Sequence, residues 1–169
     1  MNGGAGLGLL ILLTGLPATG KSTYCKHLHD GFGFHAINTD ERPEVIAEAM
    51  NFSAGFVERY CQEHDRVVIE WGFALHLLQF VLELRSQGAK LVWFEGDATL
   101  CRQRYLSRVS GDPVRMDAFE TQITLIRQAR LPTSDFQIVE VFRNGKFRSY
   151  GELDAEVFRG FEHQHHIPR

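Results

Sequence analysis

The chain contains few cysteines and no apolar stretch long enough to cross a membrane. Its 169 residues include 3 cysteines, Cys25, Cys61 and Cys101. Their wide spacing, odd number and lack of a C-x-x-C pair argue against a disulfide framework, so we expect free thiols in a reducing cytoplasm. A membrane-spanning helix needs about 20 apolar residues. The short apolar run Leu7–Leu13 has no Lys or Arg before it, unlike a secretory leader. We therefore expect no membrane partner.

An excess of charge of either sign is also missing. The chain has 18 Lys and Arg against 21 Asp and Glu, which gives a net charge of −3. This balance provides no general attraction to nucleic acid or anionic lipid, so any site for a polyanion must be local. Internal repeats, low-complexity tracts and linkers are absent from the sequence as well. A chain of this length buries about two-thirds of its unfolded surface, which predicts a single domain over residues 1–169.

The most informative stretch is a Gly-rich loop that joins an apolar strand to a helix. Residues Gly15–Ser22 have the form G-x-x-x-x-G-K-S, the pattern of a phosphate-binding P-loop. The glycines let the backbone turn so that its N–H groups face the phosphates of a nucleotide. Lys21 adds a positive charge, and the Ser22 hydroxyl is a suitable ligand for Mg²⁺. The loop predicts ATP and Mg²⁺ as cofactors, contacted by Gly15, Pro17, Ala18, Thr19, Gly20, Lys21, Ser22 and Thr23.

Apolar runs and helical periodicities alternate along the rest of the chain. After the opening apolar run, the patterning predicts strands at residues 34–38, 66–70, 90–94 and 135–142, and a hairpin turn at Asn144-Gly145. It predicts helices near residues 21–30, 43–64, 75–87, 99–109, 116–129 and 152–163. Such alternation implies an α/β fold of three layers. We expect a P-loop NTPase fold with a mostly parallel five-stranded sheet, flanking helices and a short lid near Gly111–Pro113.

Two carboxylates follow strands at the end of the sheet where ligands gather in this architecture. Phosphoryl transfer needs a carboxylate to orient the acceptor hydroxyl and another to hold Mg²⁺. Asp40 suits the first task and Glu70 the second, although the sequence leaves open which of them is the base. Asp40 has an alternative role as the N-cap of the helix that begins near Pro43. Glu70 has an alternative role as a strand-terminal carboxylate that faces solvent or pairs with an arginine.

Two arginines are spaced to act together. Arg104 and Arg108 lie four residues apart, so both project from one face of the predicted helix 99–109. An arginine fork can bond two phosphate oxygens at once, which suits a clamp on the transferring phosphoryl group. Without a P-loop nearby, a solvated basic helix face would be the better interpretation.

These residues resemble the small P-loop kinases of the AAA-domain, zeta-toxin-like group, which are related to nucleotide, shikimate and gluconate kinases. The shared patterns are Gly15–Thr23, Asn38–Glu41, Val67–Glu70 and the pair Arg104 and Arg108. The resemblance implies that Asp40 is the acceptor-side carboxylate and that both arginines belong to a lid helix. Glu70 departs from the family pattern, which usually has Asp there. A further departure is Arg42, which directly follows the Asp-Glu pair.

The sequence therefore predicts an ATP-dependent phosphotransferase that acts on a hydroxyl of a small-molecule acceptor. A nucleotide-binding switch or slow NTPase is the alternative from another class. A kinase of polynucleotide 5′-hydroxyls is a further alternative, which the acidic balance disfavours mildly. The sequence specifies neither the acceptor nor an oligomeric state.

Several other side chains have two interpretations. Trp71 and Phe73 either stack on a planar acceptor or belong to the core, and their burial habit favours the core. Arg143 and Asn144 either border the adenine, as a loop does in related kinases, or form a simple hairpin turn.

Overall fold

Five parallel strands form the centre of the molecule in our computed structural model, which describes residues 8–39, 63–73, 78–86, 88–109, 113–129 and 133–161. The strand order is β2-β3-β1-β4-β5, and all four neighbouring pairs are parallel. The predicted five-stranded sheet is thus confirmed. Its strands are β1 (Leu9–Gly15), β2 (His35–Asn38), β3 (Arg66–Glu70), β4 (Lys90–Glu95) and β5 (Gln137–Glu140).

The central strand β1 is buried along its whole length. Leu9–Leu13 are apolar without alternation, as expected for a strand covered on both faces. The pairing places Leu13 opposite Glu70 of β3 and Gly15 opposite Phe94 of β4. The carboxyl ends of these three strands therefore meet where the chain leaves β1.

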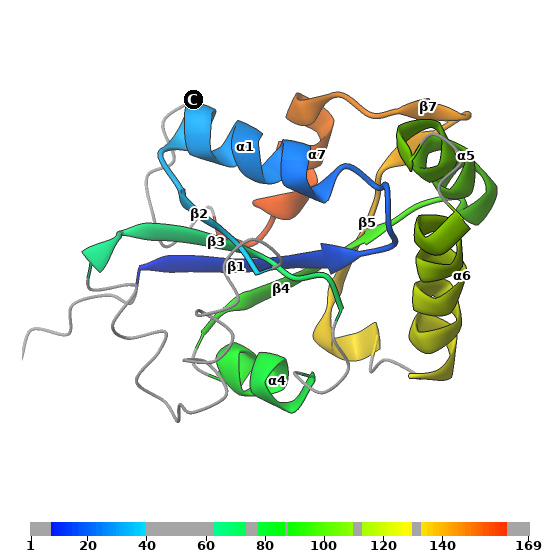
Figure 1. Cartoon of the computed structure of the whole chain (residues 1–169). Coiled ribbons are helices and arrows are strands. Elements are labelled where there is room, and N and C mark those ends of the chain that lie inside the picture. The colour runs from blue at the N-terminus through cyan, green and yellow to red at the C-terminus, as the bar shows by residue number, and fades with distance from the viewer. Residues whose placement is uncertain are drawn as a thin grey trace, which may run out of the picture.

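Helices cover both faces of the sheet, and two more stand at its end (Figure 1). Helices α1 (Lys21–Phe32) and α7 (Tyr150–Val157) lie on one face, and α4 (Leu78–Ser86) lies on the other. Helices α5 (Ala98–Val109) and α6 (Pro113–Gln128) lie beyond the carboxyl end of β1. The layers enclose two apolar clusters. One joins the sheet to α4, α5 and α6, and the other joins it to α1 and α7.

A cluster of polar side chains connects α7 to α1. The Tyr24 hydroxyl donates to Asp154 Oδ1 at 2.8 Å, and His27 Nε2 lies 3.0 Å from Asp154 Oδ2. Burial raises the pKa of the Tyr24 hydroxyl, and the nearby Asp154 carboxylate raises it further. The His27 ring also stacks on Tyr150, with 4.3 Å between ring centroids.

The chain after β4 differs from the sequence prediction. The strand expected at residues 135–142 is divided into a 3-10 turn, η2 (Thr133–Asp135), the strand β5, and a separate strand, β6 (Phe142–Arg143). β6 pairs antiparallel with β7 (Lys146–Phe147) around Asn144 and Gly145, whose φ angles of 51° and 73° match a tight hairpin turn. The predicted hairpin turn is confirmed, with shorter strands than expected.

Helix ends differ from the prediction for identifiable reasons. Helix α1 runs two residues further than expected, to Phe32, and Gly33 ends it with a φ of 70°. Pro113, predicted to lie in a loop, instead opens α6, where the missing N–H of proline costs nothing. The last helix begins earlier than expected, because Ser149 and Glu152 form a capping box, and it ends at Val157.

Several predictions fall on residues outside the described ranges. These are residues 43–62 of the helix expected at 43–64, the lid residues Gly111 and Asp112, and the carboxylate Asp40. Within the described ranges, no helix combines the length and apolar character that a membrane span requires.

Candidate phosphate-binding site

The loop between β1 and α1 folds tightly against β4. Gly15 has a φ of 139°, and a Cβ atom there would lie 2.2 Å from the carbonyl oxygen of Phe94. Only glycine permits this approach and this backbone conformation. Gly20, with a φ of 84°, precedes the first turn of α1, and Thr19 Oγ1 donates to the Leu16 carbonyl at 2.7 Å. The backbone therefore turns directly into a helix N-terminus, as anion binding requires.

The Lys21 side chain lies inside this loop. Its Nζ donates to the carbonyl oxygens of Gly15 at 3.2 Å and Leu16 at 2.9 Å, and the residue is buried. Both acceptors belong to the backbone that surrounds the expected phosphate position. The ammonium group is thus held where it can exchange a carbonyl for a phosphate oxygen.

Ser22 and Glu70 meet at the start of α1. The Ser22 hydroxyl donates to Glu70 Oε1 at 2.7 Å. Glu70 ends β3 beside Leu13, so the sheet register brings it to the loop, and it is 9% exposed. The charge of Glu70 also affects Cys25. Burial is the main cause that raises the pKa of the Cys25 thiol, and Glu70 raises it further, while Lys21 offsets part of this increase.

Ser22 and Glu70 are a suitable donor pair for Mg²⁺. A hydroxyl and a carboxylate are hard oxygen ligands, and Mg²⁺ is usually held by one or two such groups together with phosphates and water. Among the residues that the structure describes, no group of three or more His, Cys, Asp or Glu is placed to hold a metal ion. The residues therefore fit a Mg²⁺ ion that arrives with a nucleotide better than a metal held in an all-protein cage.

A pocket of about 480 Å³ opens beside the loop. On one side lie the loop, the first turn of α1 and the end of β3, and on the other lie α5 and α6. Its described lining residues are Pro17, Ala18, Gly20, Lys21, Ser22, Thr23, Glu70, Gly72, Tyr105, Arg108, Val109 and Gln122. Arg108 is thus among the residues that line the P-loop pocket, and its predicted role as part of a phosphate clamp stays a prediction.

Arg104 takes a different position from Arg108. Its guanidinium carbon lies 5.3 Å from the ring centroids of both Phe142 and Phe147, which is a cation–π distance. Four residues along a helix share a face but differ by one turn, about 6 Å, along the axis. Arg104 therefore sits level with the β6–β7 hairpin, and it is not among the described lining residues of the P-loop pocket. Phe147 lies close to Gly20, so this position adjoins the loop.

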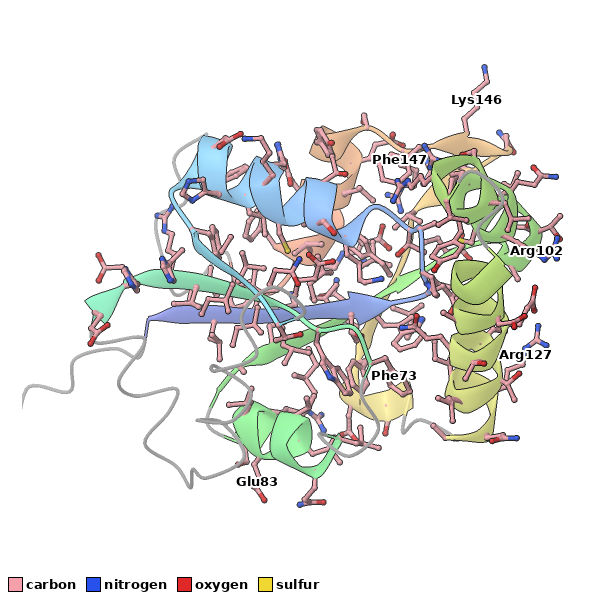
Figure 2. The ribbon with its side chains drawn as sticks, in the orientation of Figure 1. Phe73, Glu83, Arg102, Arg127, Lys146 and Phe147 are labelled. Atoms are coloured by element: carbon pink, nitrogen blue, oxygen red, sulfur yellow. The ribbon has the colours of Figure 1, made fainter. Side chains whose placement is uncertain are left out.

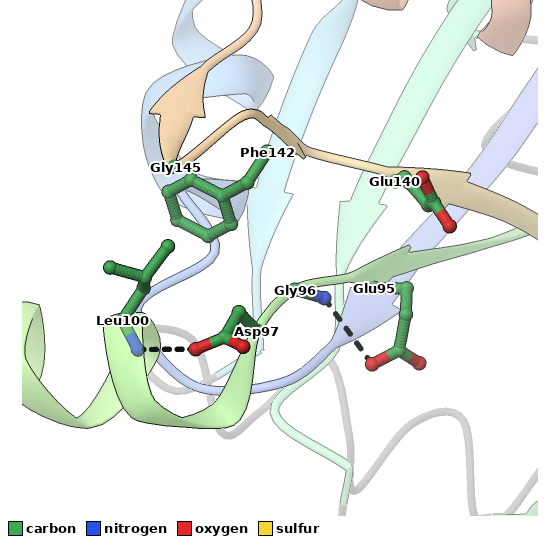
Figure 3. Close-up of a pocket in the computed structure, with 7 residues that line it drawn as sticks. All are labelled: Glu95, Gly96, Asp97, Leu100, Glu140, Phe142 and Gly145. Carbon is green, nitrogen blue, oxygen red and sulfur yellow. Dashed lines mark hydrogen bonds between the residues drawn. The ribbon is translucent and has the colours of Figure 1, made fainter.

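A second pocket, of about 540 Å³, lies between the start of α5 and the hairpin (Figure 3). Two of its carboxylates have structural partners. Asp97 Oδ1 accepts from the backbone N–H of Leu100 at 2.9 Å and so caps α5. Glu95 accepts from the indole of Trp93 at 2.8 Å and from the Gly96 N–H at 3.3 Å. Its remaining described lining residues are Leu100, Glu140, Phe142 and Gly145.

The core interpretation of Trp71 and Phe73 is confirmed. They are 1% and 3% exposed, and their rings pack together at 4.9 Å between centroids. Arg143 pairs with Glu152 at 2.9 Å next to the hairpin turn, which agrees with the turn interpretation of this segment. Arg127 points away from the sheet in Figure 2, on the outer side of α6.

Gln122 is a pocket residue that the sequence analysis missed. It lies in the middle of α6, and its Nε2 donates to the carbonyl oxygen of Gly72, which follows β3. The two residues are 50 positions apart in the chain. A helical glutamine carries no sequence signal of such a contact, which depends on how α6 packs.

No protein-family model matches the chain, and no curated protein matches it in sequence. Solved structures do match it in fold. A gluconokinase from Sinorhizobium meliloti 1021 has a TM-score of 0.58 and 16% sequence identity, over 92% of this chain and 93% of that one. A shikimate kinase from Bacteroides thetaiotaomicron has a TM-score of 0.52 and 16% identity, over 91% and 96%.

A sugar kinase from Janibacter sp. HTCC2649 is also similar, with a TM-score of 0.56 and 11% identity over 92% of this chain and 95% of that one. At such low identity these matches establish the fold, which is the α/β fold of the P-loop kinases, with its parallel sheet between helices. The narrower resemblance to zeta-toxin-like kinases stays a prediction.

Proposed function

We propose that the chain is an ATP- and Mg²⁺-dependent phosphotransferase that moves the γ-phosphoryl group to a hydroxyl of a small-molecule acceptor. One observation carries this proposal: the hydrogen-bonded Ser22 and Glu70, the buried Lys21 and Arg108 line one pocket. A kinase needs this combination of phosphate cradle, metal ligands and opposing cation. The similar structures include a gluconokinase, a shikimate kinase and a sugar kinase, which supports a small acceptor over a nucleic acid.

The loop residues would bind the triphosphate. The backbone N–H groups of Gly15–Thr23 and the N-terminus of α1 would surround the phosphates, and Lys21 would leave its carbonyl partners to neutralise them. Ser22 and Glu70 would hold Mg²⁺, which supplies charge neutralisation at the β- and γ-phosphates. A site already lined by charged groups needs little rearrangement during the reaction, which favours the transition state.

The acceptor end and the nucleoside end would lie on opposite sides of the loop. Asp40, outside the described residues, would orient the acceptor hydroxyl and take its proton. Arg108 would stabilise charge on the moving phosphoryl group. Arg104 belongs to the same proposal. Its position over Phe142 and Phe147 favours contact with the nucleoside of ATP, because the base can stack on a guanidinium group or an aromatic ring.

The test mixes the protein with ATP, Mg²⁺ and a panel that holds gluconate, shikimate, neutral sugars, nucleosides and a 5′-hydroxyl oligonucleotide, and measures ADP release. Acceptor-dependent release supports the kinase. Lys21→Ala should abolish it. Lys26→Ala removes an exposed lysine five residues further along α1 and should not. Asp40→Asn should retain ATP binding and lose transfer. Retention of one nucleotide per chain without transfer would refute the kinase and support a switch.

A further inference from the structure

The pocket wall that faces the P-loop contains an amide side chain tied to the opposite side. Gln122 Nε2 on α6 lies 2.5 Å from the carbonyl oxygen of Gly72. A carbonyl oxygen can only accept a hydrogen bond, so the amide nitrogen must face Gly72, and the amide oxygen of Gln122 is directed away from it. This bond connects α6 to the segment that directly follows the proposed Mg²⁺ ligand, Glu70.

The segment that receives this bond, Trp71–Phe73, is held at both ends. The Trp71 N–H donates to the Leu13 carbonyl at 2.9 Å, and Thr14 Oγ1 donates to the Trp71 carbonyl at 3.0 Å. Phe73 has a φ of 62°, unusual for a residue with a side chain. Its ring is buried between Trp71 and Trp93. The cluster that contains Phe73 also includes side chains of α4 and α6, on the side of the sheet where Figure 2 shows Phe73.

Between these two anchors, the Gly72 carbonyl is the point where α6 holds the segment. Gly72 and Gln122 both line the P-loop pocket, together with Glu70 and Ser22. A movement of the Trp71–Phe73 segment relative to α6 changes the width of the pocket between β3 and α6. Misplacement of a reacting group by about 1 Å can reduce a rate about a hundredfold.

We propose that Gln122 is a positioning residue for the phosphate acceptor, because its hydrogen bond fixes the Trp71–Phe73 segment beside the pocket and leaves its amide oxygen directed away from Gly72, where it can accept from a hydroxyl of the acceptor. This inference rests on the proposed phosphotransferase function. It assigns Gln122 a role at the acceptor end and none in binding ATP, since the described nucleotide-binding groups lie on β1, α1, β3 and α5.

The kinetic test compares Gln122→Met with Gln128→Met. Methionine has nearly the length and helix propensity of glutamine but cannot donate to a carbonyl. Gln128 ends the same helix with an exposed side chain, so its substitution is the matched control. For the acceptor that the wild type phosphorylates, Gln122→Met should lower kcat/KM about tenfold to a hundredfold. The KM for ATP and the affinity for a fluorescent ADP analogue should stay within about twofold, and Gln128→Met should match the wild type.

A second measurement needs no acceptor. The chain has 2 tryptophans, so Trp93→Phe leaves Trp71 as a reporter next to Gly72. In that background, Gln122→Met should raise the iodide quenching constant of Trp71 at least twofold, because the segment opens more often when α6 no longer holds it.

The outcomes separate the two proposals. Unchanged acceptor kinetics in Gln122→Met overturns the positioning role, as does an equal loss of ATP and acceptor affinity, which indicates general destabilisation. Unchanged quenching of Trp71 overturns the claim that the bond fixes the segment. If the wild type phosphorylates no acceptor while quenching rises as expected, the proposed phosphotransferase function fails and the tie between Gln122 and the segment stands.

Discussion

Gly15→Ala should be the most damaging single-methyl change in the P-loop, and its cost follows from the structure. The added Cβ would lie 2.2 Å from the Phe94 carbonyl oxygen and 2.8 Å from the Phe94 nitrogen. Real Cβ atoms do not approach backbone that closely, so β1 and β4 would have to move apart. The Leu16 N–H donates to the same carbonyl at 3.3 Å, and this bond would be lost with the movement.

Two separate costs add. A residue with a side chain at a φ of 139° carries about 1–3 kcal/mol of backbone strain. Forcing an extra methyl group into a packed site costs about another 1–3 kcal/mol. Together they remove about 2–6 kcal/mol, a large part of the 5–15 kcal/mol that stabilises a typical domain. ATP binding should fall as well, because the loop cannot keep its conformation.

Gly33→Ala is the matched control. Gly33 also has a positive φ, of 70°, but a Cβ there would meet nothing within 4 Å. It should therefore cost about 1 kcal/mol, the strain of the left-handed conformation alone. Urea unfolding followed by circular dichroism measures both variants. If Gly15→Ala destabilised the protein no more than Gly33→Ala does, the close approach of β1 to β4 would be refuted as the reason for glycine.

Three further predictions concern the metal, the thiols and the tryptophans. Glu70→Gln should keep the fold and raise the Mg²⁺ concentration for half-maximal turnover about tenfold to a hundredfold; an unchanged Mg²⁺ titration would contradict the assignment. Burial raises the pKa of the Cys101 thiol to about 11, so at pH 8 about one such thiol in a thousand is ionised. Because Cys25 is buried too, a thiol reagent at pH 8 should modify no more than one of the 3 cysteines in the native protein and all 3 after unfolding; modification of two or more native thiols would disprove this. The indole N–H of Trp93 donates to a carboxylate, whereas that of Trp71 has no partner among the described residues. Trp93→Phe should therefore cost about 1.5 kcal/mol more than Trp71→Phe in urea unfolding, and equal costs would count against this reasoning.

Sequence reasoning predicted the sheet and the P-loop because both depend on local patterns. The run of buried residues in β1 and the glycines after it carry their own signal, and parallel register then follows from alternation with helices. Glu70 was predicted from its place at a strand end, and the Ser22–Glu70 bond agrees with that placement.

The remaining features depend on how distant segments pack. The spacing of Arg104 and Arg108 predicted one shared face, but which neighbour each meets depends on the position of the β6–β7 hairpin along α5. The contact from Gln122 to Gly72 has no pattern in either segment. Tertiary contacts of this kind can be identified only when the positions of whole helices in the fold are known.

The polar cluster between α1 and α7 has a consequence for the order in which the molecule is completed. Tyr24 and Asp154 are 130 residues apart, yet their bond connects α7 to the buried side of the helix that carries Lys21 and Ser22. During synthesis the N-terminal part of a chain emerges long before the C-terminal part. The buried tyrosine of the P-loop helix therefore gains this partner only after a segment 130 residues further along the chain has left the ribosome, so the packing of α1 is completed long after α1 itself is translated.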